Sequence, residues 1–182
     1  GRVGTQVSVV GANFPAKNDE GESVTVTVQY DAGTNKTNST TVVPDASGNF
    51  SASVQVPTNA SIPSDNTVKA SFSDASSTAI TVYTTSTHSV PSASIALSKD
   101  SGPAGTTLTI TGSGFKRYSP VSEVLAGTTD VTPSPKPSTD ANGQATFDIT
   151  IPGLDVGAQT IKVTSASTAA SAAFTVGADS TV

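Results

Sequence analysis

The 182-residue chain contains no cysteine, methionine or tryptophan, and it has a single histidine, His88. Without cysteine the protein can form neither a disulfide framework nor a thiolate metal site. One histidine and no cysteine also exclude the common catalytic zinc sites. A Ser–His–Asp triad would depend on His88, and the chain lacks the GxSxG nucleophile elbow. The sequence therefore predicts that the protein is not an enzyme and that it has no catalytic residues.

Charge and long apolar runs are also scarce. Charged residues make up 13% of the chain, and 14 acidic residues against 9 basic ones give a net charge of −5. No basic cluster is longer than Lys116-Arg117, so the electrostatic footprint of a nucleic-acid-binding protein is lacking. No apolar run reaches the roughly 18 residues of a membrane span, and no GxxxxGK[ST] loop for phosphate occurs. We therefore expect no nucleic-acid partner, no membrane span in this chain and no cofactor.

Serine and threonine are abundant, 56 in total, and they alternate with apolar residues along many segments. An alternation with period two places one face of a strand in a core and the other in water. Glycine, proline, asparagine and aspartate between the segments supply turns. The sequence predicts an all-β fold without a convincing helix. The expected strands are residues 6–10, 23–30, 49–57, 67–72, 79–83, 106–112, 121–127, 144–152, 159–165 and 171–177.

The two halves of the chain repeat one another. "GTQVSVVGANF" at residues 4–14 returns as "GTTLTITGSGF" at 105–115, and "DASGNFSASVQVP" at 45–57 returns as "DANGQATFDITIP" at 140–152. Phe50 aligns with Ala145 and Ala52 with Phe147, so the aromatic ring moves by two positions and stays on the same strand face. We expect all six phenylalanines in the cores. The repeat predicts two domains, at 1–84 and 92–182, joined by a linker at 85–91 that carries His88.

The two Gly-Thr anchors, the two Asp hairpins and the closing "ITV" and "FTV" strands carry a family resemblance. The chain resembles the tandem immunoglobulin-like repeats of bacterial and archaeal cell-surface proteins, and "SGPAGTTLTITGSGF" makes the second unit similar to the IPT/TIG variety. The resemblance implies two tandem immunoglobulin-like β-sandwich domains in an extracellular, cell-surface protein. It further implies a non-catalytic structural role, as a stalk, fibre (filament) or surface-layer segment that assembles with other protein subunits or surface components.

The alternative role is an adhesin or carbohydrate-binding module that recognises a host or surface ligand. A carbohydrate site usually displays a planar aromatic platform. The chain has no tryptophan and only three scattered tyrosines, so the sequence offers little material for such a platform.

The first unit departs from the expected pattern at its start. Residues 92–104 precede the anchor of the second unit and suffice for the first strand of a sandwich, whereas only residues 1–3 precede the anchor of the first. Without that strand, a neighbouring strand would present unpaired backbone groups. Three interpretations stay open: a cut in a longer protein, a unit that manages without the strand, or strand exchange with a neighbouring copy.

Two kinds of acidic loop are calcium candidates. Asp45 and Asp140, each followed three residues later by glycine, are better explained as type I turns in which the carboxylate accepts backbone N–H groups. Asp19, Glu20 and Glu22 form the one tight acidic cluster and are the better calcium candidates, against the interpretation of a solvated loop. Calcium takes six to eight oxygen ligands, more than one such loop supplies alone.

Asn-x-Ser/Thr triplets in the first unit are candidate glycosylation sites in a secreted protein, although their number is close to chance. The candidate glycan acceptors are Asn35, Asn38, Asn49 and Asn59.

Two loops are expected between strands. One is at 132–139, where alternating prolines forbid a central strand, and the other is at 33–40, in the similar place of the first unit.

Overall fold

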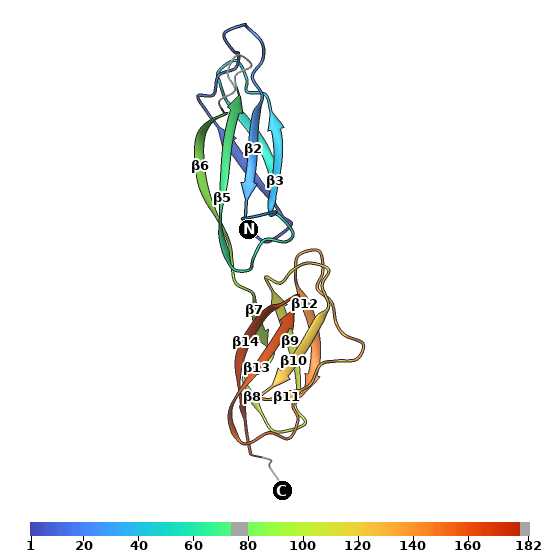
Figure 1. The fold of residues 1–182 in the computed structure, drawn as a ribbon. Coiled ribbons are helices and arrows are strands. Elements are labelled where there is room, and N and C mark those ends of the chain that lie inside the picture. The colour runs from blue at the N-terminus through green and yellow to red at the C-terminus, as the bar shows by residue number, and fades with distance from the viewer. Residues whose placement is uncertain (74–79, 179–182) are drawn as a thin grey trace. The chain divides into compact units, whose positions relative to one another are not determined.

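The computed structural model of the chain describes residues 1–73 and 80–178, with side chains described for 1–72 and 85–178. The chain divides into two units, Gly1–Pro91 and Ser92–Val182. Within the described residues there are strands, turns and loops but no helix (Figure 1). The predicted all-β class is therefore confirmed.

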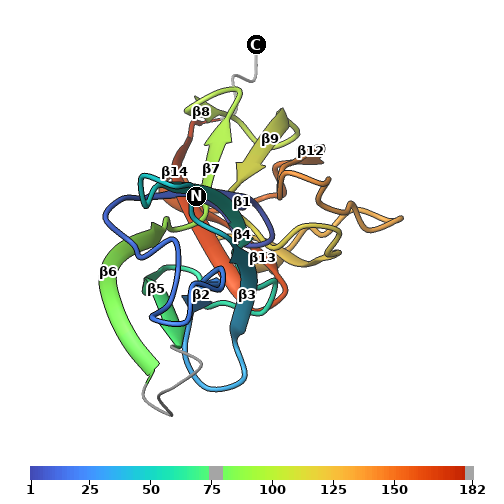
Figure 2. The same cartoon turned by 90° about the horizontal axis from the view of Figure 1, so that it is seen from above.

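The first unit is built from two facing sheets. Strands β3, β2, β5 and β6 follow one another across one sheet (Figure 2), and β1 pairs with β4 in the other. All of these pairings are antiparallel. The strands are β1 (Gln6–Gly11), β2 (Val26–Asp31), β3 (Thr37–Val42), β4 (Phe50–Gln55), β5 (Ser64–Ser73) and β6 (Ile80–Val90).

The second unit has the same plan with an additional strand at its start. One sheet has the order β12-β9-β7 and the other the order β11-β10-β13-β14-β8. The start of the unit is divided between both sheets, because β7 pairs antiparallel with β9 while β8 pairs parallel with β14. The strands are β7 (Ser94–Leu97), β8 (Ser101–Gly102), β9 (Thr107–Ser113), β10 (Val121–Ala126), β11 (Thr129–Asp130), β12 (Ala145–Thr150), β13 (Gly157–Ser165) and β14 (Thr168–Val176).

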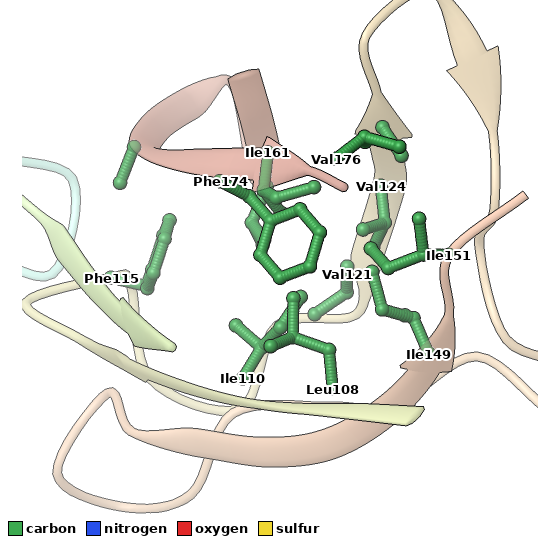
Figure 3. Close-up of a cluster of buried hydrophobic side chains, with 13 residues drawn as sticks. Leu108, Ile110, Phe115, Val121, Val124, Ile149, Ile151, Ile161, Phe174 and Val176 are labelled. Carbon is green, nitrogen blue, oxygen red and sulfur yellow. The ribbon is translucent and has the colours of Figure 1, made fainter. Parts of the chain in front are cut away.

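Alternating side chains fill the core of each unit. In β2 the inward residues Val26, Val28 and Tyr30 are fully buried. In the second unit, Ile161 and Phe174 from one sheet lie opposite Leu108 and Ile110 from the other (Figure 3). These are the two-sided cores that the period-two pattern predicts.

The phenylalanines pack as the sequence predicts. Phe50 and Ala145 are buried at matching positions of β4 and β12, and Ala52 and Phe147 lie two residues further along on the same inward face. The trade of a large for a small residue is therefore confirmed. The other phenylalanines are likewise buried or partly buried against the cores.

The two Asp loops are turns, as predicted. The Oδ1 atom of Asp45 accepts from Ser47 N at 2.8 Å and from Asn49 N at 2.9 Å. Asp140 makes the same two bonds with Asn142 N at 2.7 Å and Gln144 N at 2.8 Å. The glycine at the fourth position of each turn has a positive φ, which glycine adopts without strain.

The linker predicted at 85–91 is wrong for most of its length. Residues up to Val90 belong to β6 and pair with β5, as Thr87 does with Thr67 and Val90 with Ser64. The hydroxyl-rich composition that suggests a linker belongs to a strand with mostly exposed side chains. Ala79 of the strand predicted at 79–83 lies outside the described residues.

A second correction concerns residues 33–40, for which the sequence predicts a loop. Residues from Thr37 onward form β3, which pairs with β2 along its whole length. Every side chain of β3 before Val42 is polar, so the segment lacks the apolar alternation that marks the other strands. The loop expected at 132–139 is found, apart from one isolated bridge between Pro120 and Ser138.

Candidate functional site

The candidate site is the edge of β1 in the first unit. Its counterpart in the second unit, β9, is paired on both sides, with β12 on one and β7 on the other. Among the described residues β1 pairs with β4 alone. The register of β1 on β4 matches that of β9 on β12, since Gly11 lies opposite Phe50 and Gly112 opposite Ala145.

The hydrogen-bonding phase of β1 shows which backbone groups face the open side. Val56 N donates to Thr5 O at 2.9 Å. Antiparallel strands bond at every second residue, so Val7 and Val9 face β4, while Ser8 and Val10 direct their N–H and C=O groups away from it. In the second unit Thr109, the counterpart of Ser8, accepts from Ser98 N at 2.9 Å.

A groove of about 220 Å³ runs along this edge. One wall is β1 and the other is the part of β6 near His88, with Val68 of β5 between them. In the second unit the corresponding space between β9 and β14 is taken by β7 and β8. The residues that line the groove are Val7, Ser8, Val9, Val10, Val68, Ser86, Thr87 and His88.

Side-chain exposure along β1 reflects the open edge. Val7 and Val9 are only partly buried, whereas their counterparts Leu108 and Ile110 have no exposed surface. The first unit thus leaves apolar surface accessible at the place where the second unit has covered it.

A polar network extends from His88, which lines the groove, to the buried residues Tyr30 and Asn66. Asn66 Nδ2 donates to Tyr30 Oη at 3.0 Å, and Tyr30 Oη lies 2.8 Å from His88 Nδ1. The Gly1 ammonium, 2.8 Å from His88 Nε2, can only donate, so the neutral imidazole accepts at Nε2 and donates its Nδ1–H to the Tyr30 oxygen. The network joins β2, β5 and β6.

Burial governs the protonation of this network. It raises the pKa of the Tyr30 hydroxyl, an effect that the bond from Asn66 partly offsets. Burial also lowers the pKa of the His88 imidazole, and the positive charge of the Gly1 amino group, 2.8 Å from Nε2, lowers it further. Both shifts favour the neutral pair.

Sequence reasoning missed this network, because it placed His88 in a linker and counted Tyr30 only among three scattered tyrosines. The signal for Tyr30 was present, since it continues the alternation of Val24, Val26 and Val28. Nothing in the sequence indicated that residues 30, 66 and 88 meet, because that contact depends on the order of strands in the sheet. The side chain of another tyrosine, Tyr83, lies outside the described residues.

A second groove, of about 580 Å³, lies among the loops of the first unit. It borders the acidic loop at Lys17–Asp19 and the turn at Ala46–Gly48. The remaining residues around the groove are Asn13, Phe14, Pro15, Ala16, Val24 and Phe72.

Tyr118 of the second unit is the one aromatic side chain found largely exposed in the described part, with Arg117 Cζ 5.9 Å from its ring centroid.

The acidic calcium candidates do not converge. Asp19, Glu20 and Glu22 are exposed in a loop that Asn18 organises, its Oδ1 accepting from Glu20 N at 3.1 Å and from Glu22 N at 2.8 Å. No group of three His, Cys, Asp or Glu side chains that could hold a metal ion is found across residues 1–72 and 85–178.

The candidate glycan acceptors differ in their surroundings. Asn35, Asn49 and Asn59 are exposed, and Asn38 is half-buried in β3. Asn38 Nδ2 donates to Gln55 O at 2.9 Å and Asn59 Nδ2 to Asn35 O at 3.1 Å. A glycan on Asn38 would disrupt the bond between β3 and β4, so this triplet fits its structural role better than attachment.

Comparison with known families identifies the second unit. Residues 93–176 match the model of the IPT/TIG domain, which confirms the resemblance predicted for this unit. A search of curated proteins found no match. No helix long and apolar enough for a membrane crossing occurs in the part of the chain that the structure describes.

Three solved structures are similar to nearly the whole chain. The Yersinia pseudotuberculosis adhesin InvE is 14% identical, with 97% of this chain and 55% of that chain covered and a TM-score of 0.37. SGBP-B from a xyloglucan utilization locus of Bacteroides uniformis is 19% identical (96% and 45% covered, TM-score 0.35). Invasin, a bacterial integrin-binding protein, is 16% identical (96% of this chain and 40% of that chain covered, TM-score 0.32). The chain spans about half the length of these proteins.

Proposed function

We propose that the chain is a non-catalytic structural module of an exported cell-surface protein, a stalk, fibre or surface-layer segment that assembles through protein–protein contacts. The observation that carries the proposal is the division of the chain into two β-sandwich units in series, each with a hydrophobic core of its own. Modules of this kind suit a stalk or fibre, and their strand edges favour pairing with another polypeptide. Strand exchange with a neighbouring copy is one form that this assembly can take.

Composition supports the location. Neither unit needs a disulfide, and the outer strand faces carry hydroxyls in place of ion pairs. The described residues hold two salt bridges, Lys69–Asp31 at 3.4 Å and Lys162–Glu123 at 3.9 Å. The stability of such a chain depends little on the redox state and the salt concentration of the medium outside the cell.

Protease shaving of intact cells that produce the protein tests the location. We expect peptides of this chain among those released from the surface, and surface cross-linking to join it to other surface proteins. Recovery of the chain from the cytoplasmic fraction alone would contradict the proposal.

Adhesion or carbohydrate binding is the second candidate, favoured by the loop groove of the first unit. Binding of the chain to a glycan array or to host-matrix proteins would support it, provided that Lys17→Ala weakens the binding. Lys116→Ala, which removes the same side chain outside the groove, is the matched control. Equal binding by both variants would exclude this groove as the site.

A further inference from the structure

We propose that the chain pairs with a second copy of itself through β3, edge to edge and antiparallel, about a two-fold axis at Ser39. The sheets to which the two β3 strands belong then join into one continuous sheet. The inference rests on the proposed assembly function and names the strand that would perform the contact.

β3 is the outermost strand of its sheet, and β2 is its one partner strand among the described residues. The second unit shows where the segments that begin such a unit go, because β7 pairs with β9 and β8 with β14. The strand at the place of β3, β11, stays outermost there as well. The β3 edge therefore does not depend on the strands that begin a unit.

The hydrogen-bonding phase shows which groups β3 directs outward. Ala32 N donates to Lys36 O at 2.9 Å, which makes these two residues a bonded pair. Antiparallel strands bond at every second residue, so the even-numbered residues of β3 bond to β2. The odd-numbered residues have exposed side chains and direct their N–H and C=O groups away from β2; they are Thr37, Ser39 and Thr41.

The two units treat this edge differently. In the second unit β11 has two residues, and Pro133, Pro135, Lys136 and Pro137 follow it closely in the chain. Proline and lysine are residues that keep a strand edge from pairing. β3 has six residues, and none of them is charged or a proline. The first unit thus presents a template for a further strand at the edge that the second unit blocks.

The sequence of β3 complements itself in the antiparallel direction. With Ser39 opposite the second copy's Ser39, Thr37 lies opposite the second copy's Thr41, and facing residues exchange their outward backbone bonds. Pairing about Asn38 or Thr40 would instead leave Thr41 or Thr37 opposite a residue outside β3. In the register about Ser39 the facing hydroxyls stabilise the pair and no like charges meet.

A second copy fits this edge better than a foreign segment. Recognition of a foreign strand takes its specificity from pockets for alternate side chains, and no residue of β3 lines either groove of the first unit. An identical strand needs only the backbone groups and hydroxyls in their self-complementary order. Because a contact of one strand is small, the pair is weak in dilute solution and gains from a high local concentration of copies on one surface.

Sedimentation equilibrium of the whole 182-residue chain tests the pairing. We expect a monomer–dimer equilibrium, with hydrogen exchange at the Ser39 amide slowing as the protein concentration rises. A chain that stays monomeric at about 1 mM, the range of the weakest specific contacts, would overturn the proposal.

A charge swap locates the axis. Ser39→Lys and Ser39→Asp each place like charges across it and should weaken the dimer by about tenfold or more, whereas an equal mixture of the two variants should associate again. Thr67→Lys and Thr67→Asp are the matched controls, because Thr67 is exposed on β5, which is paired on both sides. Thermal unfolding establishes that each variant folds. Equal weakening at both positions, or no recovery in the mixture, would refute pairing at Ser39.

The absence of cysteine allows a second probe. Ser39→Cys places two thiols on facing residues whose Cα atoms lie about 5.5 Å apart, a separation at which a disulfide forms. Oxidation should link two copies through this position and leave Thr67→Cys largely unlinked. Equal linking of both variants would contradict the axis, and linking of Ser39→Cys on intact cells to a different protein would overturn the choice of a second copy.

Surface location is measured independently, by protease shaving. Dimers formed by a chain that is found only inside cells would contradict the proposed function and leave the strand contact standing. A chain at the cell surface that stays monomeric when purified would do the opposite.

Discussion

Gly143 shows why the Asp turn has the same composition in both units. Its φ is +68°, and a Cβ atom built on it would lie 2.1 Å from the carbonyl oxygen of Phe115. At the matching place a Cβ on Gly48 would lie 2.4 Å from Phe14 O. The glycine lets the turn approach the strand end that carries the core phenylalanine, and the Asp side chain fixes the loop around it.

Gly143→Ala is therefore expected to destabilise the second unit by about 2 kcal/mol or more, from the sum of the left-handed φ and the backbone collision. Urea unfolding, followed by a spectroscopic signal that arises in the second unit, measures the change in its free energy of unfolding. Gly153→Ala is the control, because a Cβ atom added to Gly153 would meet no other atom within 4 Å and the residue is exposed. It should shift stability by less than about 0.5 kcal/mol, and equal losses in both variants would refute the explanation.

His88 gives the chain a pH response that can be assigned to one residue, since no other histidine exists. Protonation would charge a ring that is partly withdrawn from solvent, and it would place an N–H at Nε2 against the Gly1 ammonium 2.8 Å away. The lowered pKa of His88 means that the unfolded chain takes up this proton more readily than the folded one.

The contribution of His88 to stability is thus complete above the unfolded value of about 6.5 and is lost as the pH falls toward the lower folded pKa. We expect the urea midpoint of the first unit to fall between about pH 7.5 and pH 5.5. His88→Gln, which keeps a side-chain acceptor and does not titrate, should flatten this decrease. An unchanged slope in the variant would show that another group is responsible.

At the scale of elements, β1 and β9 are the same strand in two surroundings. Ser8 and Val10 face the open edge, whereas Thr109 donates its N–H to Ser98 Oγ at 2.9 Å. The difference lies in what covers the strand and not in its sequence pattern, which the two anchors share.

We expect the amides of Ser8 and Val10 to exchange with solvent at least about tenfold faster than those of Val7 and Val9, which face β4. In β9 the amides of Thr109 and Thr111 should instead be protected. Hydrogen exchange followed by NMR at low protein concentration makes the comparison. Equal protection at Ser8 and Val9 would mean that the edge of β1 is covered.

Sequence reasoning succeeded where a strand carries its own signal. β9 and β12 were predicted nearly to the residue, because apolar and polar residues alternate and the turn residues mark their ends. It failed at β3, a polar edge strand held by pairing with β2, and at the second half of β6, whose exposed hydroxyl residues imitate a linker. Both depend on a neighbour distant in sequence, which overrides local composition.

The candidate site was predictable in part for the same reason. The short segment before the first Gly-Thr anchor, set against residues 92–104 of the second unit, pointed to an unpaired strand. The sequence could not predict the groove, because Val68 and His88 line it from β5 and β6, and the order of these strands is known only from the folded sheet. The repeat within the chain is what made the comparison of the two edges available.

At the scale of the whole molecule, the chain has two hydrophobic cores that share no residue. The core of the second unit includes Ile161, and that of the first includes Val28, both without exposed surface. Each core is formed by residues from both sheets of its own unit, so each unit buries apolar surface of its own.

Ile161→Ala should accordingly destabilise the second unit by about 2–5 kcal/mol, through lost burial and the cavity left behind. Native-state hydrogen exchange, read by mass spectrometry on peptides from each unit, should show the loss of protection in Ser92–Val182 and unchanged protection in Gly1–Pro91. Val28→Ala is the reciprocal variant and should affect the first unit alone. Loss of protection in both units from either substitution would show that they unfold as one cooperative body, and the description of two separate cores as two folding units would then be wrong.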